Sequence, residues 1–121
     1  MLKLSILPGL VLFIILLSLS ACGEPAAEDL IMEGEDLYIV NCARCHQVDG
    51  TGAEGQFPRL AGNPVVTLNN PAPVIQAVLY GRGSMPAFQG ALSQEEAAAI
   101  ISYIRNAWGN QATGVLPRQV R

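Results

Sequence analysis

Apolar residues recur at helical spacing near the C-terminal end of the chain, and this is the clearest periodic pattern in the sequence. Ser93 and Glu96 stand just before it and have the spacing of a capping box, a pair that marks the start of a helix. The pattern predicts a helix that begins at this box and stops before Gly109. Its apolar face comprises Ala97, Ile100, Ile101, Ile104 and Trp108.

A second, shorter pattern predicts a helix in the middle of the chain. Asn70 has the properties of an N-cap residue, Pro71 suits the first turn, and Gly81 is expected to end the helix. The apolar stripe between them consists of Val74, Ile75, Val78 and Leu79.

A third helix is expected over residues 33–46. Acidic side chains crowd its start, where the helix dipole favours them, and Gly34, Tyr38 and Cys42 recur along one side. Between 47 and 70 no periodicity appears, because glycines and prolines interrupt the segment. Three helices with almost no strand pattern predict an all-α domain with long loops.

The N-terminal end indicates export. Lys3 precedes an uncharged apolar run from Leu4 to Ala21, which is typical of a signal peptide. Residues 19–22, Leu-Ser-Ala-Cys, resemble a bacterial lipobox, in which Cys22 becomes the lipid-modified first residue of the mature chain. Two alternatives are an uncleaved membrane helix and a cleaved signal without a lipid. All three put the rest of the chain outside the cytoplasm.

Length and charge limit what remains. A chain of 121 residues supports one small domain, and a formal net charge of −3 argues against nucleic acid as a partner. We expect a signal peptide at 1–21, a lipidated cysteine and tether at 22–32, one domain at 33–110, and a flexible tail at 111–121.

The sequence Cys42-Ala43-Arg44-Cys45-His46 has the C-x-x-C-H spacing of covalent haem attachment. The two thiols add to the two vinyl groups of one haem, and the adjacent histidine supplies the proximal imidazole to the iron. A redox disulfide would need a strand pattern that this chain lacks. A zinc site would need a fourth ligand, and His46 is the only histidine. A haem would also give the long loop a core to wrap around.

The second axial ligand is predicted to be Met85. Haem iron takes histidine or methionine there, and the chain has no second histidine. Met1 belongs to the signal peptide, and Met32 lies too close to His46 in the chain to reach the opposite side of the haem easily. Two alternatives stay open: Met85 could be a packing residue, or the iron could be five-coordinate, with gas or peroxide chemistry.

Together these residues resemble a class I cytochrome c over roughly residues 33–110, in a compact bacterial form. The resemblance implies that Gly34 and Tyr103 meet where the first and last helices cross. It also implies that the carbonyl of Pro58 accepts the Nδ1 proton of His46. Arg59 and Arg82 are candidate partners of the haem propionates, or else solvated surface residues.

This resemblance implies an electron carrier rather than an enzyme. We expect a lipid-anchored monohaem cytochrome that carries single electrons between respiratory-chain components outside the cytoplasm. Its donor and acceptor are expected to be a membrane respiratory complex or an exported dehydrogenase. The alternatives are a fixed haem subunit of a larger membrane complex, such as alternative complex III or a terminal oxidase, and an open-site haem sensor or peroxidase.

Overall fold

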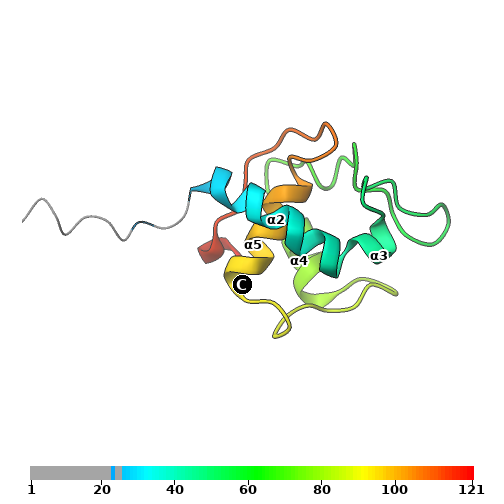
Figure 1. The fold of residues 1–121 in the computed structure, drawn as a ribbon. Helices are drawn as coiled ribbons and strands as arrows, with labels where there is room; N and C mark the ends of the chain where they lie inside the picture. The colour runs from blue at the N-terminus through cyan, green and yellow to red at the C-terminus, as the bar shows by residue number, and fades with distance from the viewer. Residues whose placement is uncertain (1–22, 24–25) are drawn as a thin grey trace, which may run out of the picture.

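Two helices, α2 (Ala27–Asn41) and α5 (Gln94–Ile104), pack across each other and form the centre of the fold (Figure 1). The computed structural model describes Gly23 and residues 26–121. Helix α3 (Ala43–His46) follows α2, α4 (Ala72–Tyr80) precedes α5, and the 3-10 helix η1 (Pro117–Gln119) lies near the C-terminus. The described residues contain isolated β-bridges but no strand, so the expectation of an all-α fold is confirmed.

The contact between α2 and α5 depends on a residue without a side chain. A Cβ atom at Gly34 would overlap the main-chain carbonyl of Ala99 and approach the Cβ of Tyr103. Tyr38, one turn further along α2, is completely buried, and its ring centroid lies 5.5 Å from that of Tyr103. The crossing expected at Gly34 and Tyr103 is present.

Helix α2 differs from the prediction at both ends. It begins at Ala27 rather than near residue 33, and Leu30 in this added turn is buried in the core at 2% exposure. The tether expected over 22–32 is therefore wrong for residues 27–32, because burying Leu30 stabilises another helical turn. The helix also breaks at Cys42, which separates α2 from the single turn of α3.

Helices α4 and α5 begin at or within one residue of the predicted start. The main-chain N–H of Glu96 donates to Ser93 Oγ at 3.1 Å, and that of Ser93 donates to Glu96 Oε2 at 2.8 Å, which confirms the capping box. Helix α5 ends at Ile104 rather than continuing to Trp108. At α4 the N-cap is Pro71, one residue later than predicted, while Asn70 Oδ1 accepts from the N–H of the helix's first residue.

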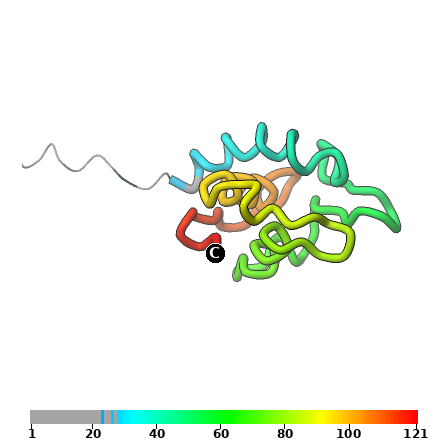
Figure 2. Tube along the Cα trace, turned by 90° about the horizontal axis from the view of Figure 1, so that it is seen from below, coloured from blue at the N-terminus to red at the C-terminus, as the bar shows by residue number. Residues whose placement is uncertain are grey.

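The C-terminal segment is packed against α5, so the expectation of a flexible tail over 111–121 is wrong. Val115 and Val120 are 0% and 1% exposed. Ser102 Oγ both donates to the carbonyl of Val115 and accepts from its N–H, and Gln94 Nε2 donates to the carbonyl of Val120 at 2.9 Å. Figure 2 shows this segment, in red, returning to lie beside α5. Val115 and Val120 belong to no periodic apolar pattern, so the sequence around them did not indicate that they are buried.

Asn110 fastens the long loop to the end of α5. Its Oδ1 accepts from the N–H of Gly62 at 2.8 Å, and its Nδ2 donates to the carbonyls of Leu60 and Ile104 at 3.1 and 2.7 Å. The loop therefore has a fixed course although it has no regular secondary structure. No described helix has the length and apolar character that a membrane span requires. Cys22 and the expected signal peptide lie outside the described residues.

Candidate haem site

The sequence-predicted site residues meet in one cavity. Cys42, Cys45, His46, Pro58 and Met85 all line a hollow of about 500 Å³ whose other walls are mainly apolar. Side chains from α2, α4, α5 and the loops around residues 56–66 and 82–88 complete it. An apolar cavity with a few polar groups on its wall is the usual form of a cofactor site.

The two thiols sit where α2 gives way to α3. Both cysteines are half-buried and form no disulfide. Burial, followed by the proximity of Cys45, raises the pKa of the Cys42 thiol to about 11. Reactive redox cysteines have depressed pKa values, and Cys42 lacks that property. No group of three or more histidine, cysteine or acidic side chains that could hold a metal ion occurs among the described residues.

The His46 imidazole is 7% exposed and has a defined tautomer. Its Nδ1 lies 3.0 Å from the carbonyl oxygen of Pro58, the partner that the resemblance implied. A carbonyl can only accept a hydrogen bond, so Nδ1 donates its proton to Pro58. In the neutral ring this leaves the lone pair on Nε2, the nitrogen that can then bind a metal ion.

The turn that follows His46 is held by two aromatic side chains. Gln47 has φ 66° and ψ 156°, a conformation that is strained for a residue with a Cβ atom. The hydroxyl of Tyr38 donates to the carbonyl of Gln47 at 2.6 Å, and Trp108 Nε1 donates to the carbonyl of Val48 at 3.0 Å. The strain therefore persists because Tyr38 on α2 and Trp108 in the segment after α5 together fix the turn.

Met85 reaches the cavity from the connection between α4 and α5. Its N–H donates to the carbonyl of Arg82 at 3.0 Å, and the Arg82 N–H donates back to the carbonyl of Met85. Gly81 has φ 74° and lies so close to the Met85 carbonyl that a Cβ atom would overlap it. This tight loop fixes the methionine at the wall. Met32, by contrast, is 72% exposed and does not line the cavity.

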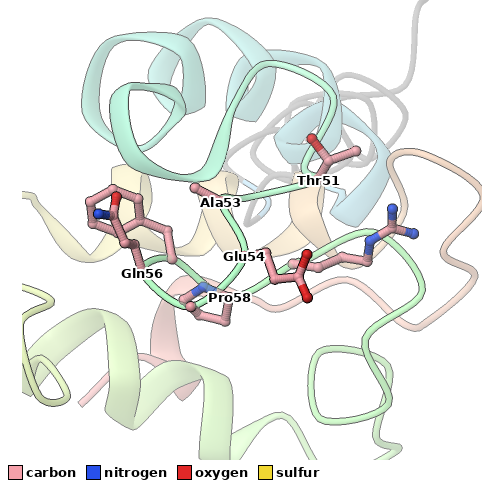
Figure 3. A pocket seen from close by; sticks show the side chains of 8 residues that line it. Thr51, Ala53, Glu54, Gln56 and Pro58 are labelled. Carbon is pink, nitrogen blue, oxygen red and sulfur yellow. The ribbon is translucent and has the colours of Figure 1, made fainter.

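The two candidate arginines lie in different places. Arg82 lines the cavity, whereas Arg59 lines a separate shallow hollow along the 51–59 loop. In Figure 3 the side chains of Thr51 and Glu54 point to one side of this loop and Gln56 to the other. Pro58 belongs to both linings, so the loop forms the wall between the hollow and the cavity. Only Arg82 is therefore positioned at the cavity itself.

Sequence reasoning missed Arg105, which is completely buried behind the cavity wall. The signal that could have revealed it is its spacing: it follows Ile101 by one helical turn and so continues the buried face of α5. It also missed Asn110, since a single asparagine after a predicted helix carries no pattern.

Comparison with known proteins identifies this arrangement. The model of the family described as "Cytochrome C oxidase, cbb3-type, subunit III" matches residues 29–104, more than half of the chain. The chain belongs to this family of c-type cytochromes. The C-x-x-C-H sequence of the cytochrome, together with Pro58 and Met85, falls inside the matched range.

Individual relatives agree with the family. The cytochrome c subunit of the quinone-dependent alcohol dehydrogenase of Gluconobacter oxydans is 38% identical over 94 residues, covering 69% of this chain and 20% of that subunit. Cytochrome c-552 of Thermus thermophilus is 34% identical over 93 residues, covering 64% of this chain and 70% of the relative. The chain thus spans about a fifth of the length of the dehydrogenase subunit.

A solved structure supports the fold. Cytochrome cL of Methylophaga aminisulfidivorans superposes with a TM-score of 0.54 at 22% identity, over 74% of this chain and 71% of that one. The cytochrome therefore has the cytochrome c fold and carries covalent haem c with its iron. The relatives that it matches are themselves named as cytochromes or as cytochrome c subunits of larger complexes.

Proposed function

We propose that this protein is a membrane-anchored monohaem cytochrome that carries single electrons between respiratory-chain components outside the cytoplasm. The observation that supports this proposal most directly is the shared cavity. Two free thiols, an imidazole with a free Nε2 and a thioether occur together on its largely apolar wall. This set matches covalent attachment with histidine–methionine ligation.

In the proposed site each residue has a separate role. The sulfur atoms of Cys42 and Cys45 would hold the haem covalently, and His46 Nε2 and the Met85 sulfur would bind its iron. When bound, the haem supplies an iron that alternates between the ferric and ferrous states. Pro58 keeps the His46 ring in one tautomer and makes it a better electron donor. The neutral thioether of Met85 and the apolar wall favour the ferrous state and so raise the reduction potential.

The visible spectrum of the haem-matured protein tests this ligation. We expect a low-spin spectrum in the ferric and ferrous states, a weak ferric band from the sulfur–iron bond, and no change on adding carbon monoxide. The Met85→Ala variant should keep its haem but bind carbon monoxide. Met32→Ala is the matched control and should behave as the native protein, because Met32 is exposed and outside the cavity. High-spin iron that binds carbon monoxide in the native protein would contradict the assignment.

The proposed anchor is a lipid on Cys22, and the early start of α2 limits how far the domain could then lie from it. If Cys22 is the lipidated first residue, only residues 23–26 separate the lipid from the helix. Four extended residues reach at most about 14 Å, so the domain would stay against the membrane surface. Incorporation of labelled palmitate and retention in the membrane fraction are expected for the native chain. Both should be lost in Cys22→Ser, and membrane retention without palmitate would contradict the lipid.

A fixed subunit of a larger oxidoreductase is the second candidate. It is favoured by the alcohol dehydrogenase relative, since a domain similar to this chain occupies a fifth of that cytochrome subunit. Extraction in mild detergent separates the two candidates. A monomer supports the mobile carrier, whereas stable co-purification with other subunits supports the fixed one. The open-site sensor or peroxidase is disfavoured because Met85 lines the cavity.

A further inference from the structure

Arg105 is a charged side chain with no exposed surface. It caps the C-terminal end of α5 and is 0% exposed. Its Nε donates to the carbonyl of Thr113 at 2.9 Å, and its Nη1 donates to the carbonyl of Val66 at 2.7 Å. The guanidinium therefore bridges the C-terminal segment and the long loop through main-chain oxygens.

The acceptors of this guanidinium are neutral. No carboxylate among the described residues forms an ion pair with Arg105, and its pKa is lowered by burial alone. The charged side chains of the elements that pack around it include Glu95, Glu96, Arg59 and Arg118, and none of them contributes to that shift. An arginine keeps its proton even when buried, so the site holds a full positive charge. Burying an uncompensated charge is unfavourable, which makes a purely structural role for it costly.

The charge lies directly behind the cavity. Val66, whose carbonyl accepts from Nη1, and Ile104, the residue before Arg105, both line the proposed haem site. The guanidinium contacts this wall directly through its hydrogen bond to Val66, and Arg105, Val66 and Ile104 are all buried from bulk solvent, at 0%, 4% and 4% exposure. Electrostatic interactions across such an interior are far less screened than at a surface.

We propose that the buried positive charge of Arg105 raises the reduction potential of this cytochrome. The step is the gain of one electron, supplied by the redox partner, which converts ferric to ferrous iron without any bond or proton change in the side chain. The ferric state carries one more positive charge than the ferrous state, so a fixed cation behind Val66 disfavours it. This inference rests on the proposed site at His46 and Met85.

The potential of two variants, measured over a range of pH, tests the charge itself. Arg105→Met removes the charge, and we expect its one-electron equilibrium to shift at least tenfold toward the ferric state, which is about 59 mV. In Arg105→Lys the buried amine has a depressed pKa. Its potential should match the native value at low pH and fall toward that of Arg105→Met as the amine loses its proton. The native potential should show no such fall.

Arg121→Met is the matched control, because it removes the same charge from an exposed position and should leave the potential unchanged. Each variant is first checked for a low-spin spectrum that is insensitive to carbon monoxide. Equal potentials in the native protein and Arg105→Met, or a pH-independent potential in Arg105→Lys, would overturn the proposal. If Arg105→Met does not fold, the titration of Arg105→Lys decides alone. Carbon monoxide binding by the native protein would instead indicate failure of the proposed site.

Discussion

Gly34 on α2 and Ala99 on α5 meet main chain to main chain, so closely that no side chain fits between them. This contact brings the aromatic rings of Tyr38 and Tyr103 together beside it. The two helices that form the core are therefore joined at a point where only glycine is tolerated, and that point lies one turn from a residue that lines the cavity.

The Gly34→Ala variant is expected to lose about 3 kcal/mol of unfolding free energy, because the added methyl group forces the two helices apart. Denaturant unfolding of the haem-matured protein measures this loss. Gly55→Ala is the control, since its Cβ atom would meet nothing within 4 Å. Its φ of 74° should limit the loss to about 1 kcal/mol. Equal losses of unfolding free energy in the two variants would show that the contact between α2 and α5 can accommodate a methyl group at residue 34.

The strained turn after His46 predicts a stabilising substitution. Replacing Gln47 by glycine relieves a conformation that is costly for a residue with a Cβ atom, and should raise the unfolding free energy by about 1 kcal/mol. The hydroxyl of Tyr38 donates to the same residue's carbonyl, so Tyr38→Phe should lower the unfolding free energy by about 1 kcal/mol. Thermal or denaturant unfolding measures both. A loss of stability in Gln47→Gly would show that the turn is not strained.

Alkaline pH should destabilise the fold through Tyr38. Burial, and then the neighbouring Cys42, Tyr103 and Asp49, raises the pKa of this phenol above its ordinary value near 10. The unfolded chain therefore releases the proton more readily than the folded one. The contribution of the protonated Tyr38 phenol to the unfolding free energy is complete below pH 10. Above pH 10 it decreases by at most about 1.4 kcal/mol per pH unit.

Unfolding midpoints of the native protein and Tyr38→Phe, compared between pH 8 and pH 11, measure this effect. The native midpoint should fall more steeply with pH than that of the variant, because only the native protein has the buried phenol at this position. Tyr103, whose pKa burial also raises, titrates in both proteins and is thereby controlled. Parallel pH profiles would contradict the prediction.

Packing of the C-terminal segment has its own test. Val115→Ala removes two methyl groups from a fully buried position and is expected to lower the unfolding free energy by about 2 kcal/mol. Val40→Ala is the control, because Val40 is 79% exposed and should change stability by less than about 0.5 kcal/mol. Denaturant unfolding distinguishes the two. A Val115 variant as stable as the control would restore the flexible tail that the sequence predicted.

The sequence by itself determined the features that depend on neighbours in the chain. The capping box of Ser93 and Glu96 is such a feature, because its two hydrogen bonds join residues three positions apart. The spacing of Cys42, Cys45 and His46 is another, since one helical turn brings them to the same cavity. Met85 could be selected because so few other ligands were present.

Only the tertiary structure decided the features that depend on distant contacts. Leu30 extends α2, and Val115 anchors the C-terminal segment, because each finds an apolar partner that no local pattern announces. Arg105 is buried because carbonyls from two separate segments, at Val66 and Thr113, converge on its guanidinium. Periodicity reports which face of a helix is apolar, whereas burial of a polar side chain depends on acceptors that folding brings from elsewhere in the chain.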